Sequence, residues 1–405
     1  MPKTMALYVS DNKQLTGSIP ASWVHFATGV LCLSLDNTQV GGCLPDGLVV
    51  DIELEPCSVV SPEAAALAQL KLLLEAPGIS AGPGLSTWAG GTNYCGGSWA
   101  GITCEGPSTV IDLNLTALAI SVQGPATLPL LNVVAALSNL TDLQTLSLAG
   151  IGLSGPVHEP GRPSLDSFTQ LRHLDISGNP ALSGDLPSSW FAMRGLTTLD
   201  ISATGIKGTL PEDFAAFQEL RVFRAVACPG VTGSLPPAWG LLKLERLRVL
   251  DLSLSAPGRG GLGGALPAAF AQLEQLQVLV LSGHNFNGSL PQAWTRLSQL
   301  RVLDVSRNSL TGSLPKWYAS MLQLAVLKVH DNQLVPATSG SPEFFEYLVG
   351  DGLKLQCLCV GNNSGVLLDA AKAAELKRRA QASSPPAQLV IDQPTDRLCV
   401  AQAWQ

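Results

Sequence analysis

The sequence predicts an α/β solenoid: a right-handed superhelix with a parallel β-sheet on its concave face and turns and 3₁₀ helices on its convex side. The first observation is the six-residue phrase "LTGSLP" at residues 310–315, which returns in related forms at steps of 24–31 residues. The second is a short alternation of apolar and polar residues ahead of each copy, typical of a strand with one buried face. The third is composition: 40 Gly, 28 Pro and 14% charged residues suit many short elements joined by turns. A regular period in this range indicates stacked units.

One repeating unit is "LSQLRVLDVSRNSLTGSLP" at residues 297–315. Because side chains alternate along a strand, Leu303 and Val305 should point into the solenoid, and Val302, Asp304 and Ser306 should point outward. The unit then turns a corner, where an Asn amide can satisfy backbone groups that a tight turn leaves without partners. We expect about ten such repeats over residues 109–364.

An aromatic residue stands three positions after most of the repeated prolines. Aromatic ladders can bind sugars, but periodic aromatics in repeat proteins more often pack inside, and we expect these to form the convex side of the core. The residues are Trp190, Phe214, Trp239, Phe270, Trp294 and Tyr318.

The frame of Leu, Asn, Gly and Pro at fixed offsets resembles the plant-type leucine-rich repeat, LxxLxLxxNxLxGxIP, over residues 109–364 and separately over residues 5–47. The resemblance implies the solenoid fold. Several units depart from it at the Asn position, where we expect a weaker or differently made corner; these positions hold Ile151, Thr204, Cys228, Ser255 and His284. We expect Cys228 to be an unpaired thiol, because the nearest cysteines in sequence lie several repeats away.

Residues 58–108 break the period and resemble the N-terminal cap of plant leucine-rich repeat proteins. Apolar residues recur at helical spacing after residue 62, and "STW" and "CGGSWAGITC" follow. The resemblance implies a disulfide between Cys95 and Cys104, with two buried thiols as the alternative. A cap is needed because the first strand of a solenoid would otherwise present an unpaired edge.

Residues 1–57 are interpreted as the tail of a preceding array, and residues 365–405 as a C-terminal cap helix, near 366–381, with its tail. "CLSLDN" at 32–37 resembles "CLCVGN" at 357–362, and "LVVDIELEPC" at 48–57 resembles "LVIDQPTDRLC" at 389–399. Each array therefore closes with a similar strand and cysteine. In an oxidising compartment we expect Cys57 to pair with Cys32, and Cys399 with Cys357 or Cys359.

Several classes of function are disfavoured. The net charge of −7 and pI near 5.3 argue against nucleic acid. Apolar runs are too short to span a bilayer, and the five His lack metal-ligand spacing. "GRGGLG" at 258–263 fits a dinucleotide loop but is not followed by a helix. We expect no enzyme and no cofactor, because no nucleophile, base and orienting group come together.

The resemblance implies binding of a protein or peptide on the concave sheet, by a chain that we expect to be a monomer. Asp175, Asp200, Asp251 and Asp304 share one outward position that the family pattern itself favours, so we interpret them as a solvated ladder. The residues that depart from the pattern, or stand beside it, are the candidate contacts: His173, Arg224, Val280, Lys328 and His330.

The sequence is compatible with two cellular locations. Asn114, Asn139, Asn287 and Asn362 stand in N-x-S/T sequons, which favour a glycosylated protein of the extracellular space or secretory pathway. Such a protein would be similar to receptor-like ectodomains or to plant polygalacturonase inhibitors. The first residues do not read as a secretory signal, which favours the alternative of an intracellular scaffold in the cytoplasm, the cytoskeleton or the cilium axoneme. Oxidised cysteines and occupied sequons would distinguish the first from the second.

Overall fold

The computed structural model describes residues 61–88, 94–96, 99–106, 108–241, 244–254, 260–316, 318, 321–336, 355–364, 368–382 and 389–391, and four short strands before residue 42. The chain divides into two compact units, Met1–Ala65 and Ala66–Gln405. The domain boundaries that the sequence suggests, at residues 57, 108 and 364, stay predictions.

The first unit contains two parallel strand pairs. β1 (Met5–Tyr8) pairs with β3 (Leu31–Ser34), and β2 (Thr16–Ser18) pairs with β4 (Gln39–Gly41). Each pair joins equivalent positions of the two repeats that the sequence suggests in this region.

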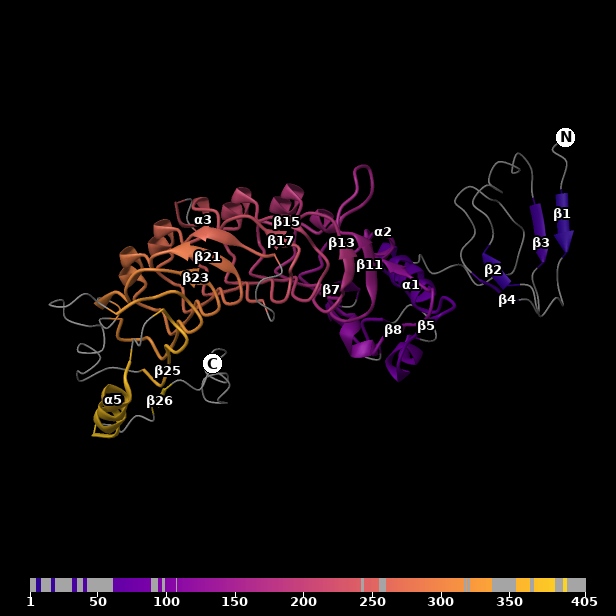
Figure 1. Cartoon of the computed structure of the whole chain (residues 1–405). Helices are drawn as coiled ribbons and strands as arrows, with labels where there is room; N and C mark the ends of the chain where they lie inside the picture. Colours follow the sequence, from indigo (N-terminus) through magenta and orange to yellow (C-terminus); the bar gives the residue numbers. More distant parts are fainter. Residues whose placement is uncertain are drawn as a thin grey trace. The chain divides into compact units, whose positions relative to one another are not determined.

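The second unit is built on a 12-stranded sheet that follows the inner side of a curved array (Figure 1). Its first strand, β6 (Ile102–Glu105), is antiparallel to β7, and all later neighbours are parallel. The predicted parallel solenoid is therefore confirmed. The parallel strands are β7 (Thr109–Asn114), β10 (Thr145–Ser147), β12 (His173–Asp175), β14 (Thr198–Asp200), β16 (Val222–Arg224), β18 (Val249–Asp251), β20 (Val278–Val280), β22 (Val302–Asp304), β24 (Val326–Lys328), β25 (Cys357–Cys359) and β26 (Val390–Ile391).

A second layer of short strands carries the Gly-x-Leu-Pro phrases. Three sheets make up this layer: β9 (Leu128–Pro129) with β11 (Leu153–Pro156) and β13 (Ala181–Ser183); β15 (Gly208–Thr209) with β17 (Val231–Thr232); and β19 (Gly263–Ala265) with β21 (Asn285–Gly288) and β23 (Ser309–Leu310). The Gly of most phrases has positive φ, for example +89° at Gly208 and +77° at Gly312. The phrase thus repeats because each unit must turn at a backbone conformation that Gly adopts without strain.

Short helices follow on the convex side, along the outer edge of the array in Figure 1. Most are single 3₁₀ turns, because each repeat leaves only a few residues between its proline and the next strand. They are α2 (Leu130–Leu137), η4 (Leu165–Ser167), η5 (Ser188–Ala192), η6 (Glu212–Ala216), α3 (Ala238–Leu241), η7 (Ala268–Gln272) and η8 (Gln292–Arg296).

The core lies between these layers, as the repeat frame predicts. Leu303 and Val305 are fully buried, and the six aromatic residues that follow the prolines are at most 1% exposed. Three of them bond to the preceding repeat: Trp239 Nε1 donates to Pro211 O at 2.9 Å, Trp294 Nε1 to Pro267 O at 2.9 Å, and Tyr318 Oη to Pro291 O at 3.0 Å. The interpretation of these aromatics as core is confirmed.

The corner of each repeat is tied to its neighbours through the Asn position. Asn308 Nδ2 donates to Leu281 O at 2.9 Å, and its Oδ1 accepts from the backbone N–H of Phe286 at 3.0 Å. In the preceding repeat, His284 takes the place of Asn and contacts one backbone N–H and one backbone carbonyl. Its Nδ1 accepts from the Leu262 N–H at 3.2 Å, and its Nε2 lies 2.6 Å from Leu252 O. The corners that lack Asn are thus differently made, as expected.

At two other corners, the side chain at the Asn position interacts with a backbone carbonyl as a donor but accepts no bond from a backbone N–H of the described residues. Thr204 Oγ1 donates to Ile201 O at 2.7 Å, and the Cys228 sulfur lies 3.2 Å from the same oxygen. Cys228 is a buried thiol outside any disulfide, which confirms the prediction. Burial raises the pKa of this thiol.

The N-terminal cap covers the first strand of the sheet. It consists of α1 (Pro62–Leu74), the 3₁₀ helix η2 (Pro83–Thr87), β6, and the short antiparallel pair β5 (Ile79–Ser80) and β8 (Ser121–Val122), followed after β7 by η3 (Leu115–Leu118). Trp88 stacks on Trp99 with ring centroids 5.3 Å apart, and a disulfide joins Cys95 to Cys104 with Cα atoms 5.4 Å apart. β6 supplies the edge strand with a partner, which is the role that a cap must fill.

At the C-terminal end, β25 and β26 continue the sheet, and α5 (Ala370–Ala382) lies between them in sequence, close to the predicted helix at 366–381. Asp369 Oδ1 accepts from the Lys372 N–H at 2.7 Å and caps the helix.

Candidate functional site

The concave face presents two rows of outward side chains, one on each side of the buried inward residue of each strand, which is Leu in most strands, Phe223 in β16 and Ile391 in β26. The strand register aligns them. The first row is Asp112, Thr145, His173, Thr198, Val222, Val249, Val278, Val302, Val326, Cys357 and Val390. The second row is Asn114, Ser147, Asp175, Asp200, Arg224, Asp251, Val280, Asp304, Lys328 and Cys359.

The rows are polar and open to solvent over strands β10–β16. We call this the polar concave surface; its members are Thr145, Ser147, His173, Asp175, Thr198, Asp200, Val222 and Arg224. His173 is exposed and the others are half-buried. The Arg224 guanidinium lies 4.0 Å from the Asp200 carboxylate on the adjacent strand, and the strand pairing sets Asp251 on its other side. Hydroxyls, carboxylates and a guanidinium are thus available to a ligand within one patch.

The aspartates of the second row have a structural role beyond that of a solvated ladder. Oδ1 of Asp175, Asp200 and Asp304 accepts from the backbone N–H two residues later at 2.9–3.0 Å. Asp251 makes the same bond to Ser253 but is only 2% exposed, and burial raises the pKa of its carboxyl. The family pattern favours Asp here because the carboxylate closes the strand end.

Over strands β20–β25 most outward positions become apolar and buried, and Asp304 and Lys328 of the second row stay half-buried. Val278, Val280, Val302, Val326, Cys357 and Cys359 form a cluster, with exposures of 0–8%. We call it the apolar concave cluster. Val302 and Ser306, which the sequence predicts to point outward, are each only 2% exposed.

Two of the five candidate contact residues are therefore covered. Val280 is 8% exposed within the apolar concave cluster, and His330 is 7% exposed, with Nε2 3.7 Å from Asp331 Oδ2. Burial lowers the pKa of His330. Neither side chain presents a surface to a ligand, whereas His173, Arg224 and Lys328 retain exposed atoms. The five residues do not form one site.

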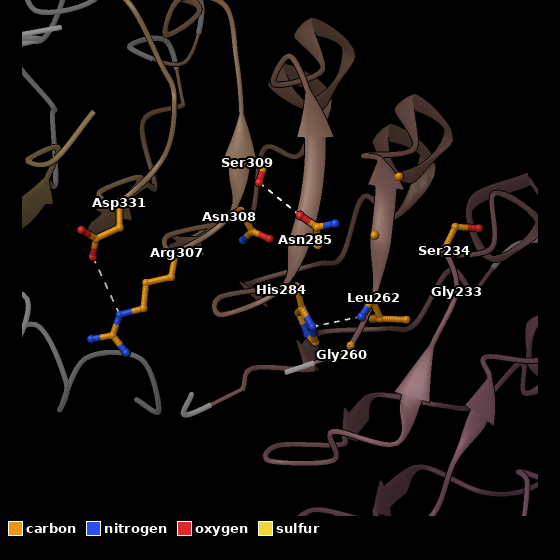
Figure 2. Close-up of a pocket in the computed structure, with 13 residues that line it drawn as sticks. Gly233, Ser234, Gly260, Leu262, His284, Asn285, Arg307, Asn308, Ser309 and Asp331 are labelled. Atoms are coloured by element: carbon orange, nitrogen blue, oxygen red, sulfur yellow. Dashed lines mark hydrogen bonds and ion pairs between the residues drawn. The ribbon is translucent and has the colours of Figure 1, made fainter. Parts of the chain in front are cut away.

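A groove of about 1120 Å³ lies beside β19, β21 and β23 (Figure 2), and none of the five predicted contact residues is among those that line it. Its walls are polar: Ser309 Oγ donates to Asn285 Oδ1 at 3.1 Å, and Arg307 Nε lies 3.9 Å from Asp331 Oδ2. Gly260, Gly261, Gly263 and Gly264 line it, so the "GRGGLG" segment borders an open groove. At Gly261, φ is +96° and a Cβ would lie 2.6 Å from His284 Nδ1, so this Gly is required by packing against the corner.

The groove and the polar concave surface offer hydrogen bonds and charge. Within the described residues, no group of three or more His, Cys, Asp or Glu side chains could hold a metal ion. In that same part of the chain, no helix has the length and apolar content that a bilayer crossing requires.

The remaining cysteines and sequons are placed as follows. Cys357 belongs to a disulfide, and Cys359 carries a thiol whose sulfur lies 3.7 Å from that of Cys357. The side chains of Cys32, Cys57 and Cys399 lie outside the described residues, so their predicted pairings stay predictions. Asn114, Asn139, Asn287 and Asn362 are all exposed, as glycan acceptors must be.

Two family models match the chain. The Leucine rich repeat N-terminal domain matches residues 60–105, which hold α1, the stacked tryptophans and the disulfide. A Leucine Rich Repeat matches residues 299–321, which contain the unit around Leu303 and Asn308. The fold is that of a leucine-rich repeat solenoid. The resemblance drawn from the repeated frame and the cap is confirmed. No curated protein sequence matches the chain.

Solved structures of plant proteins share the fold. The ectodomain of the Arabidopsis thaliana membrane receptor kinase GASSHO1/SCHENGEN3, in complex with CASPARIAN STRIP INTEGRITY FACTOR 2, is 27% identical with a TM-score of 0.58, over 74% of this chain and 33% of that one. The ectodomain of the Arabidopsis receptor kinase HAESA, in complex with an IDA peptide hormone, is 25% identical with a TM-score of 0.56. The match covers 75% of this chain and 49% of that one. A plant ice-binding protein is 21% identical with a TM-score of 0.59, and the match covers 84% of this chain and 96% of that one. The leucine-rich repeat solenoid described here thus spans a third to a half of the two receptor chains.

Proposed function

We propose that this leucine-rich repeat protein recognises a protein or peptide ligand through the polar concave surface, without catalysing a reaction. The observation that carries the proposal is the contrast along one sheet. Outward positions are mostly polar and all accessible over β10–β16, whereas over β20–β25 most are apolar and buried, and Asp304 and Lys328 are the polar, half-buried exceptions. A rigid sheet with varied, partly exposed polar side chains is suited to an extended ligand that contacts several strands at once.

The similar receptor ectodomains support the class of ligand. Those of GASSHO1/SCHENGEN3 and HAESA were solved with CASPARIAN STRIP INTEGRITY FACTOR 2 and with an IDA peptide hormone respectively. The surface of the present chain carries Asp175 and Asp200 against Arg224, so it favours ligands that bring both a basic and an acidic group. A receptor-like role and an inhibitor-like role would use the same surface.

The cap disulfide supports an extracellular or secretory location, since disulfides persist in oxidising compartments. The four exposed sequons agree with it. The alternative, an intracellular scaffold, predicts reduced Cys95 and Cys104 and unmodified Asn side chains in protein from the native source. Peptide mapping of that protein, without reduction and with glycans retained, separates the two.

The role of the polar concave surface can be tested by substituting one histidine that lies on this surface and a second histidine that lies outside it. His173 is exposed on the polar concave surface, and His158 is exposed in the turn after β11. We expect a random dodecapeptide display library to yield binders whose affinity for His173→Glu falls at least about tenfold, or 1.4 kcal/mol, and is unchanged for His158→Glu. Equal affinity for the two variants and the parent would place binding elsewhere.

A further inference from the structure

A row of exposed arginines lies along one edge of the concave face. These residues stand immediately before the first outward row, at the amino ends of β12, β16, β18 and β22, and we call them the arginine row: Arg172, Arg221, Arg248 and Arg301. Backbone hydrogen bonds align the row. Arg221 N donates to Thr197 O, and Arg248 N donates to Arg221 O, each at 2.8 Å. Since neighbouring strands are about 4.8 Å apart, Arg221 and Arg248 are adjacent, and Arg172 lies two strands away from Arg221.

The charges of the arginine row have no carboxylate partner within the described part of the chain. The salt bridges found there join other pairs, and none includes a member of this row. Glu219, two residues before Arg221, pairs with Arg246 instead. A line of exposed guanidiniums is unexpected on a protein of net charge −7. Because arginine binds carboxylates through two parallel hydrogen bonds, the row is suited to an acidic ligand.

The opposite edge of the same surface carries aspartates. Asp175 follows Arg172 by three residues, which places the two edges roughly 10 Å apart along each strand. Arg224 also belongs to this second edge, but it lies between Asp200 and Asp251, which balance its charge. The concave face over β12–β18 thus has a basic edge and an acidic edge. The floor between them is formed by the first outward row: His173, Thr198, Val222 and Val249.

The two edges favour a peptide that carries both signs of charge over a polymer of one sign. An acidic polysaccharide would be attracted to the arginine row and repelled by the aspartates about 10 Å away. In an extended peptide, successive side chains point to opposite sides, and alternate side chains are about 6.6–6.8 Å apart. A peptide that lies along the array can therefore direct every second side chain to the arginine row. Its spacing falls between one and two strand separations, within reach of the long arginine side chains.

We propose that the arginine row over β12–β18 binds the acidic side chains of an extended peptide in which acidic residues alternate with basic or polar ones. Arg221 and Arg248 bind carboxylates of two alternate residues, and Arg172 binds a third. The intervening side chains of the peptide face Asp175 and Asp200. The inference rests on the proposed function, because it assigns the charge pattern and the orientation of a ligand on the same sheet.

The dodecapeptide binders described above provide the probe. Binders whose affinity falls with His173→Glu are measured against an Arg221→Glu, Arg248→Glu variant. The matched control is Arg194→Glu, Arg296→Glu, which changes the net charge by the same amount. Both control arginines are exposed on the convex side, one just after η5 and one at the end of η8.

We expect the affinity to fall at least about tenfold in the Arg221→Glu, Arg248→Glu variant and to change less than about twofold in the control, in salt that limits the Debye length to about 8 Å. The binders should carry Asp or Glu at alternate positions. A peptide of the same composition with its acidic residues in one block should bind at least about tenfold more weakly. Replacing the acidic residues by Lys should restore binding to the variant, which also shows that the variant is folded.

Equal affinities for the two double variants would overturn the proposal, as would binders without alternating acidic residues. If the Arg221→Glu, Arg248→Glu variant loses its fold, Arg221→Gln, Arg248→Gln replaces it with the same expectation. Alginate, an acidic polysaccharide, is tested as a competitor. Displacement of the peptide by alginate, together with loss of alginate binding in the variant, would assign the row to a polysaccharide and overturn the proposal.

Failure of the inference differs from failure of the proposed function. Binders that respond to His173→Glu but not to Arg221→Glu, Arg248→Glu would contradict the inference alone. A library without any binder that responds to His173→Glu would contradict recognition through the polar concave surface, and the inference with it.

Discussion

Arg224 and Asp200 face each other across β14 and β16, with the guanidinium and carboxylate 4.0 Å apart. The strand register places the buried Asp251 on the other side of Arg224. The guanidinium therefore separates two carboxylates in the middle of the polar concave surface. Its charge opposes the rise that burial causes in the pKa of Asp251. Arg224 thus serves the fold as well as the surface.

Arg224→Glu should therefore lower the free energy of unfolding, by about 1–3 kcal/mol, because it brings three carboxylates together where two were held apart by a cation. Chemical denaturation at neutral pH measures the effect. Arg221→Glu, at an exposed position three residues earlier, is the matched control and should change stability by less than about 0.5 kcal/mol. Equal losses in the two variants would show that Arg224 does not stabilise the fold between the two aspartates.

His284 should make the protein acid-sensitive. Burial lowers the pKa of His284, and the neutral ring is the form that accepts from Leu262 N–H. Since the unfolded chain binds a proton at the ordinary pKa near 6.5 and the folded chain does not, stability should fall as pH drops below about 6.5.

His284→Asn tests this, because Asn is the residue that the frame itself uses at this corner. We expect the variant to gain stability relative to the parent as pH falls from 7.5 to 5, measured as the difference in urea midpoint. His330 is present in both proteins, so its own titration cancels in the difference. A difference that is independent of pH would contradict the assignment.

A buried and an exposed position of one repeat should differ in their sensitivity to truncation. Leu303→Ala removes a fully buried side chain and should cost ~2–5 kcal/mol, whereas Arg301→Ala, at an exposed position, should cost less than about 0.5 kcal/mol. Thermal unfolding of the two variants beside the parent measures both. Similar melting temperatures for the two would contradict the register.

Deleting residues 1–57 should leave the melting temperature of the main array unchanged. Among the described residues of the first unit, two repeats pair, and at least about three are generally needed to bury a core. The shortened chain, residues 58–405, retains α1, the tryptophan stack and the disulfide, which close the sheet. A loss of many degrees would show instead that residues 1–57 form part of the main array.

The repeat frame predicts the path of the chain because each of its positions has one local task. Leu303 lies in the core and Asn308 ties the corner, and neither depends on distant parts of the sequence. What the frame does not predict is the surroundings of an outward residue. Val280 and His330 leave the sheet on the expected side, yet both are covered.

The groove beside the glycine-rich segment escapes prediction for a related reason. It arises where Gly261 lies close to His284. Gly261 belongs to an insertion in its repeat, and His284 replaces the usual Asn at a corner, so both residues depart from the repeat frame. Packing between an insertion and a corner does not recur with the repeat, so the repeat period does not predict it. The sequence indicates it only by the extra Gly residues in the insertion.

Site-specific photo-cross-linking can show whether a ligand binds at the polar concave surface. p-Benzoylphenylalanine is introduced in place of Thr198, on the concave face, or of Asp213, exposed on the convex helix η6, and each protein is irradiated with extracellular fluid from the source organism. We expect one dominant adduct at position 198, lost when His173→Glu is added, and none at position 213. An adduct at position 213 alone, or the same adducts at both positions, would contradict it.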